Sequence, residues 1–139
     1  MKKEFILKDL NDTAKLAKNI AELAKPGVVL LLYGDLGAGK TTLTKFLAKE
    51  LGELPENVSS PTFTIIHEYN SSPPIAHVDL YRLGQSASVF DLELYEYIDR
   101  GFFIIIEWAE YINEEDFDKK IKLWLKIFNS ETRKAILEY

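Results

Sequence analysis

The stretch Tyr33-Gly34-Asp35-Leu36-Gly37-Ala38-Gly39-Lys40-Thr41-Thr42 decides the fold of this chain. It contains the pattern G-x-x-x-x-G-K-T, in which glycines allow backbone N–H groups to approach a phosphate chain closely. The apolar run at residues 28–32 precedes it and predicts a buried strand. Apolar residues at helical spacing follow it, namely Leu43, Phe46, Leu47 and Leu51. A strand, a glycine loop and a helix N-terminus in this order predict a P-loop that binds a nucleotide.

Two side chains in this loop carry the chemistry. Lys40 is a positive charge that can reach the β- and γ-phosphates, and the hydroxyl of Thr41 is the usual magnesium ligand of such loops. We therefore expect the loop to hold the nucleotide through Gly34, Asp35, Leu36, Gly37, Ala38, Gly39, Lys40, Thr41 and Thr42.

Length and composition limit the class of protein. A chain of 139 residues is typical of one domain, which we place at residues 1–139. The net charge of −5 argues against a protein that grips nucleic acid by itself, because phosphate neutralisation needs a basic face. The absence of cysteine excludes disulfides, thiolate catalysis and zinc–thiolate sites. No apolar run is long enough for a signal peptide or a membrane span, so we expect a cytoplasmic protein.

The pattern of apolar runs and turns predicts an α/β domain with a mixed, parallel and antiparallel sheet. The short turn at 70–74 favours an antiparallel hairpin, and a second hairpin is expected at the C-terminus. The expected strands are 4–7, 28–32, 63–69, 75–79, 102–107, 120–127 and 134–138. The expected helices run to about residue 25 after capping residues 10–13, over about 40–51 and over about 89–98.

Two carboxylates follow apolar strands, where ligands of open α/β sheets bind. Glu107 resembles the acidic residue of a Walker B motif, and Asp79 is the second candidate. Acids also follow strands as simple turn residues, and that alternative stays open for Asp79. Thr62 ends a Ser/Pro loop that fits a sensor of the γ-phosphate or an ordinary turn. We interpret His67 and His77, which lie inside β-type runs, as structural.

Four motifs in this order and spacing resemble the TsaE family of small bacterial ATPases, which are needed to make threonylcarbamoyladenosine in tRNA. They are the P-loop, Ser60-Pro61-Thr62-Phe63, His77-Val78-Asp79-Leu80-Tyr81-Arg82-Leu83 and Ile106-Glu107-Trp108. The resemblance covers essentially the whole chain. Ala109 departs from it, because many members carry proline after the Glu-Trp pair.

The resemblance implies a modified P-loop NTPase fold in three layers, with ATP and Mg²⁺ bound. Lys40 would contact phosphate, Thr41 and Glu107 would hold magnesium, and Asp79 would be a catalytic or metal-linked acid. Thr62 would lie on the γ-phosphate side. We also place Asp12, Thr13 and Arg133 near the nucleotide. The implied partners are the TsaD and TsaB proteins, with tRNA reached only through their complex. Hydrolysis, weak without partners, would reset that complex.

Two other functions fit the P-loop and the carboxylates. A small-molecule or nucleotide kinase is one, although we find no arginine-rich insertion that could close over an acceptor. A nucleotide-gated binding module without useful hydrolysis is the other. A GTPase is less consistent with the sequence, because the guanine-reading tetrapeptide N-K-x-D is absent.

Overall fold

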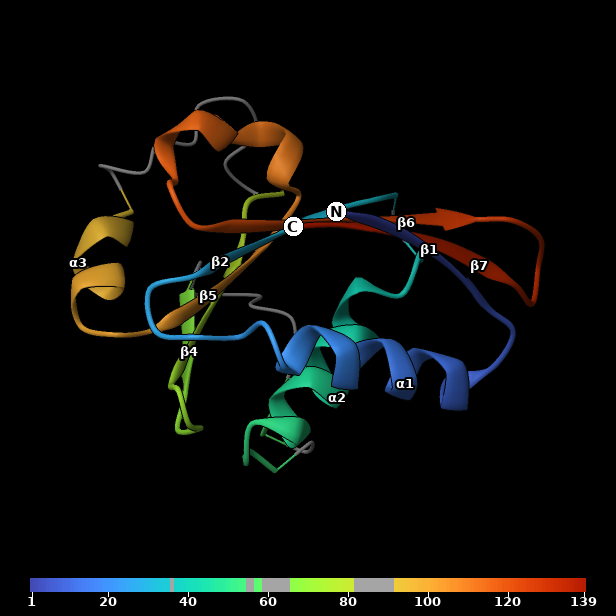
Figure 1. Ribbon diagram of the computed structural model, residues 1–139, viewed down its shortest axis with the longest axis horizontal. Coiled ribbons are helices and arrows are strands. Elements are labelled where there is room, and N and C mark those ends of the chain that lie inside the picture. The colour runs from blue at the N-terminus through green and yellow to red at the C-terminus, as the bar shows by residue number, and fades with distance from the viewer. Residues whose placement is uncertain (36, 55–56, 59–65, 82–91) are drawn as a thin grey trace.

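A computed structural model describes residues 1–35, 37–54, 57–58, 66–81 and 92–139. Within them the chain forms one seven-stranded sheet with helices on both faces (Figure 1). This confirms the predicted α/β class. The two termini lie side by side in Figure 1, and the N-terminal ammonium donates to the carbonyl oxygen of Tyr139 over 2.5 Å.

The sheet is mixed, as predicted, and its strand order is β1-β7-β6-β2-β5-β4-β3. The central strand β2 runs parallel to β5 and β6, and β4 runs parallel to β5. The pairs β3/β4, β6/β7 and β1/β7 are antiparallel, so both expected hairpins are present. The strands are β1 (Lys2–Leu7), β2 (Val29–Tyr33), β3 (Ile66–Tyr69), β4 (Ile75–Asp79), β5 (Phe103–Glu107), β6 (Lys120–Ile127) and β7 (Arg133–Glu138).

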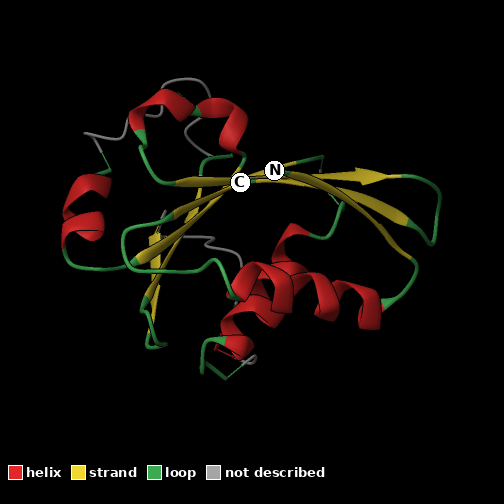
Figure 2. Cartoon of the chain, viewed as in Figure 1, coloured by secondary structure: helices red, strands yellow, loops and turns green. Residues whose placement is uncertain are grey.

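The helices form two layers, one on each face of the sheet (Figure 2). One layer holds α1 (Leu10–Ala21) and α2 (Lys40–Glu50), which pack against the sheet through Leu16, Ile20, Leu43 and Leu47 among others. The other layer holds α3 (Leu94–Asp99) and two short 3-10 helices, η3 (Ala109–Tyr111) and η4 (Glu114–Asp116). The expected three-layer arrangement is therefore confirmed.

Strand β5 contributes side chains to the apolar cores on both faces of the sheet. Phe103 and Ile105 belong to the apolar core beneath α1 and α2, whereas Ile104 and Ile106 belong to the core on the opposite face. Because side chains alternate along a strand, the next residue, Glu107, points to the same face as α2. Burial on both faces explains why this strand reads as an unbroken apolar run.

The first helix differs from the prediction at both ends. Its N-cap is Asp9, whose carboxylate accepts the N–H of Asp12 at 2.9 Å, so the capping group precedes residues 10–13. The helix ends at Ala21 rather than near residue 25. Beyond it, the N–H of Leu23 bonds the carbonyl of Ile20 in a tighter turn, which leads into the Pro-Gly stop.

Smaller differences concern the ends of other elements. Strands β1 and β7 each begin earlier than expected, because they pair with each other from Lys2 opposite Glu138 to Leu7 opposite Arg133. The predicted strand at 63–69 and helix at about 89–98 lie partly outside the described residues. No helix in the described part of the chain is both long and apolar enough to cross a membrane.

Candidate nucleotide and metal site

The P-loop joins β2 to α2, and Gly34 and Gly39 show most clearly why its backbone needs glycine. A Cβ on Gly34 would lie 2.5 Å from the carbonyl oxygen of Leu125 on β6, so the sheet itself excludes a side chain there. Gly39 has a φ of 103°, in the left-handed region, and it forms the N-cap of α2 without a side-chain cap. The first N–H groups of α2 therefore carry no capping side chain and are suited to an anion.

Lys40 lies within this loop and is 5% exposed. Its ammonium group donates to the carbonyl oxygen of Gly34 and lies 3.7 Å from the centre of the Trp108 ring. Burial lowers the pKa of Lys40, and the nearby charge of Glu107 opposes that shift. The structure thus holds a buried cation, stabilised by a carbonyl and an aromatic face, at the place where phosphate is expected.

The two predicted carboxylates lie next to each other. Asp79 is in register with Glu107 on the neighbouring parallel strands β4 and β5. Because side chains alternate along a strand, both carboxylates lie on the face of the sheet that α2 covers. The Oε1 atom of Glu107 lies 3.5 Å from the hydroxyl of Thr41. A cleft of about 270 Å³ is lined by both carboxylates together with Gly37, Gly39, Lys40, Thr41, Thr42 and Trp108. The structure therefore brings the two acids to the P-loop.

Asp79 and Glu107 have different surroundings in this cleft. The carboxylate of Asp79 accepts the N–H of Tyr81 at 3.0 Å, and burial raises its pKa above the ordinary value. Glu107 is 3% exposed, and its Oε2 atom lies 2.5 Å from Nε2 of His77, which is fully buried. The burial of His77 is consistent with the structural role predicted for it, and the structure adds a contact with Glu107. The sequence did contain a signal that His77 lies near the site. His77 is two residues from Asp79, and residues two apart on a strand share a face.

Aromatic side chains border the cleft. The Trp108 ring lies 4.9 Å from the ring of Tyr81 and 6.0 Å, stacked, from that of Tyr111. Trp108 also has a φ of 61°, which is unusual for a residue with a bulky side chain. This conformation, directly after Glu107, places the indole over Lys40 instead of continuing the strand. Trp108 therefore belongs to the cleft and also packs, with Tyr111, against the apolar core on the opposite face of the sheet.

A second pocket, of about 350 Å³, lies on the other side of the P-loop. Thr13 from α1 and Arg133 from β7 line it, together with Gly37, Ala38 and Gly39 of the loop. Arg133 donates to the carbonyl oxygen of Gly37 at 3.2 Å, so the C-terminal hairpin is tied directly to the loop. The structure thus brings Thr13 and Arg133 to the predicted site.

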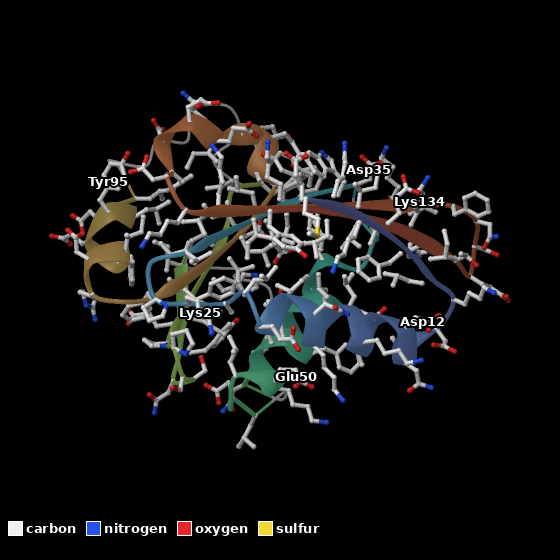
Figure 3. All side chains as sticks on the ribbon, viewed as in Figure 1. Asp12, Lys25, Asp35, Glu50, Tyr95 and Lys134 are labelled. Carbon is white, nitrogen blue, oxygen red and sulfur yellow. The ribbon has the colours of Figure 1, made fainter. Side chains whose placement is uncertain are left out.

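The remaining predicted residues are more scattered. Asp12 does not line the second pocket, because its carboxylate accepts the N–H of Lys8 at 2.9 Å, and Figure 3 shows it well apart from Asp35. Asp35 lines a separate depression with Tyr33 and Trp124. Leu36 and Thr62 lie outside the described residues.

The donor set of the cleft fits magnesium bound together with phosphate. Among the described residues, no three His, Asp or Glu side chains gather into a site that could hold a metal alone. Magnesium instead commonly takes one or two carboxylates and completes its shell with phosphate oxygens and water. Thr41 and Glu107 offer hard oxygen donors of this kind beside the loop. These residues therefore fit a magnesium ion that arrives with a nucleotide.

Comparison with known proteins gives consistent matches. Residues 7–135 match the sequence model of a family described as "Threonylcarbamoyl adenosine biosynthesis protein TsaE". A Bacillus subtilis (strain 168) protein named tRNA threonylcarbamoyladenosine biosynthesis protein TsaE is 43% identical over 123 residues, covering 88% of this chain and 76% of the relative. The protein of the same name from Aquifex aeolicus (strain VF5) is 42% identical over 135 residues, covering 96% of this chain and 93% of the relative.

A solved structure also resembles this chain. The crystal structure of Bacillus subtilis YdiB matches with a TM-score of 0.77 and 34% sequence identity, covering 99% of this chain and 84% of that one. This match agrees with the modified P-loop NTPase fold that the sequence predicts.

Proposed function

The chain belongs to the TsaE family, and from this premise we propose that it binds ATP with Mg²⁺ and hydrolyses it in support of threonylcarbamoyladenosine formation in tRNA. The names of its curated relatives state that biosynthetic role. One observation carries the ATPase part of the proposal. Lys40, Thr41 and Glu107, which come from two separate segments of the chain, line one cleft at the P-loop.

The P-loop and Lys40 would bind the phosphates. The backbone N–H groups at the start of α2 supply donors, and the uncapped helix N-terminus favours negative charge. The ammonium of Lys40 would exchange its contact with the Gly34 carbonyl for the phosphate oxygens. Because burial lowers the pKa of Lys40, an incoming anion would restore its preference for the charged form.

Thr41 and Glu107 would hold magnesium. When bound there, the ion would neutralise charge on the phosphate oxygens of the nucleotide. Glu107 is suited to this role because its carboxylate is buried and fixed on one side, with Oε1 facing the hydroxyl of Thr41.

Asp79 would act on the attacking water. Its carboxylate lies on the same face as Glu107, and burial raises its pKa, which makes it a better proton acceptor than an exposed aspartate. Asp79 would orient the water and accept its proton. The water oxygen would bond to the γ-phosphorus while the bond to the β–γ bridging oxygen breaks. The products would be ADP and inorganic phosphate.

The second pocket would take the nucleoside. It adjoins the loop on the side away from Asp79 and Glu107, and Thr13 and Arg133 line it with apolar residues of β1 and β6. A partly apolar pocket with a few polar groups is typical of base and ribose recognition.

The partners in this proposal are the TsaD and TsaB proteins. The net charge of −5 supports an indirect contact with tRNA, which the partners would hold. Hydrolysis would then be slow in the isolated chain and faster in the complex.

The test is release of phosphate from ATP by the chain alone and with TsaB, TsaD and tRNA, with Glu107→Gln as the control. We expect weak activity alone, a rise with the partners, and loss of both in the variant. A rate of hydrolysis that the partners do not change would contradict a role in tRNA modification. Recovery of labelled γ-phosphate on a metabolite instead of as inorganic phosphate would establish a kinase and overturn the proposal.

A further inference from the structure

We propose that His77 is a positioning residue that fixes the carboxylate of Glu107 for metal binding, and that Tyr69 fixes His77 in turn. This rests on the ATP–magnesium function proposed above. The three residues lie on three adjacent strands, β3, β4 and β5, and form a buried chain of hydrogen bonds that ends at the P-loop.

The two oxygens of Glu107 have different neighbours. Oε2 lies 2.5 Å from Nε2 of His77, and the two side chains are 4% and 0% exposed. Oε1 lies 3.5 Å from the hydroxyl of Thr41. A rotation of the carboxylate away from His77 would leave a buried donor without its acceptor, which is costly in the absence of water. His77 therefore holds one oxygen so that the other faces the P-loop.

Tyr69 determines whether Nε2, the nitrogen of His77 that faces Glu107, carries a proton. The hydroxyl of Tyr69 lies 2.9 Å from Nδ1 of His77, and Tyr69 is 4% exposed. When the hydroxyl donates to Nδ1, the neutral ring carries its proton on Nε2 and donates it to Glu107. The Tyr69 contact thus selects the ring form in which His77 acts as a donor.

A purely structural role explains this chain less well. Apolar side chains of similar volume would fill the same space without removing charged and polar groups from water, and such replacements are often neutral or stabilising. What apolar residues cannot supply is a direction for Glu107. Partners of this kind, behind a metal ligand, commonly set its orientation, and their loss lowers metal affinity or activity by about 10- to 100-fold.

The test separates metal binding from nucleotide binding. Mn²⁺, which accepts the same oxygen donors as Mg²⁺, is titrated into ADP-saturated protein, and free Mn²⁺ is followed by electron paramagnetic resonance. The affinity for ADP alone is measured in EDTA by calorimetry. The variants are His77→Leu, His77→Gln and Tyr69→Phe. His67→Leu is the matched control, because His67 faces His77 across the β3/β4 hairpin.

We expect His77→Leu to weaken Mn²⁺ binding by about 10- to 100-fold while ADP affinity in EDTA stays unchanged. His77→Gln should recover most of the loss, because its amide N–H can replace the Nε2 donor. Tyr69→Phe should give a smaller loss, since the donor remains but its orientation is less fixed. His67→Leu should bind Mn²⁺ as the wild type does.

Mn²⁺ binding that is the same in all variants and the wild type would overturn the positioning role while leaving the proposed function intact. A wild type that binds ADP but no Mn²⁺ would overturn the proposed function itself, and the positioning role with it. If His77→Leu fails to fold, Tyr69→Phe decides. A loss confined to Mn²⁺ supports the role, and a parallel loss of metal-free ADP binding contradicts it.

Discussion

Asp79 and Glu107 occupy equivalent places in the sheet, yet their surroundings differ. They are in register at the ends of parallel strands and line the same cleft. Glu107 is 3% exposed, and His77 contacts one of its oxygens within the sheet. Asp79 is half-buried and accepts the backbone N–H of Tyr81, and burial raises its pKa. Glu107 is held by a buried side chain, whereas Asp79 is held by a backbone N–H and burial raises its pKa.

Position at a strand end therefore brings an acid to the site but does not assign its role. The neighbouring side chains do that. A fixed, hydrogen-bonded carboxylate suits a metal ligand, whereas a carboxylate with a raised pKa suits proton transfer.

The largest effect is expected for Glu107→Gln. Loss of the charged metal ligand should lower the rate of ATP hydrolysis by about a thousandfold, the upper range for removing one group that stabilises charge in the transition state. ADP affinity in EDTA should not change. Phosphate release and calorimetry check both. A larger loss in Asp79→Asn than in Glu107→Gln would reverse the assignment.

Asp79→Asn should lower kcat by about a hundredfold, as expected for loss of a proton acceptor. The asparagine oxygen can still accept the N–H of Tyr81, so the backbone should keep its conformation. Mn²⁺ affinity of the ADP complex should stay near that of the wild type. Strong loss of Mn²⁺ would show that Asp79 is itself a metal ligand.

The same variant should unfold at a higher temperature than the wild type when no metal is bound. Because burial raises the pKa of Asp79, its contribution to stability is present below the unfolded value of 3.8 and is lost as the pH rises through the folded pKa. Asp79→Asn should therefore raise the Tm by a few degrees near neutral pH, and the difference should shrink on acidification. Thermal unfolding followed by circular dichroism checks this. A variant less stable at neutral pH would contradict it.

The smallest effect concerns the coupling of each acid to Lys40. Glu107 is the strongest charge acting on the Lys40 pKa, and Asp79 acts more weakly. A double-mutant cycle of Lys40→Met with Glu107→Gln should give a coupling of about 1 kcal/mol in metal-free stability, and the cycle with Asp79→Asn a smaller one. Equal coupling energies in the two cycles would contradict the stronger interaction of Lys40 with Glu107 than with Asp79.

Much of the site could be predicted because its signals are local. The P-loop is one contiguous run, and the rule that strand ends meet at one edge placed both acids beside it. The hydrogen bond between His77 and Glu107, which are 30 positions apart, could not be predicted. It depends on how β4 and β5 pair, and the sequence of either strand alone does not record their register. The two ends of α1 were predicted wrongly for separate reasons. Asp9 is as good a capping residue by type as Asn11, Asp12 or Thr13, and a tight turn after Ala21 has the same kind of sequence as a continued helix.

The pocket residues show both outcomes. Arg133, which is predicted near the nucleotide, begins β7, and the strand order brings it to the carbonyl oxygen of Gly37. Asp12 appeared suitable for a nucleotide contact by its position in the chain. In the fold its carboxylate is bound to the backbone of Lys8 instead.

The most direct test is a crystal structure of the chain with Mg²⁺ and a non-hydrolysable ATP analogue. We predict that the phosphates lie on the N–H groups of the P-loop and that Lys40 contacts a phosphate oxygen. We further predict that Thr41 and Glu107 hold Mg²⁺, directly or through water, with His77 still bound to Glu107. A metal held by Asp79 with Glu107 uninvolved, or phosphates bound away from the P-loop, would contradict these predictions.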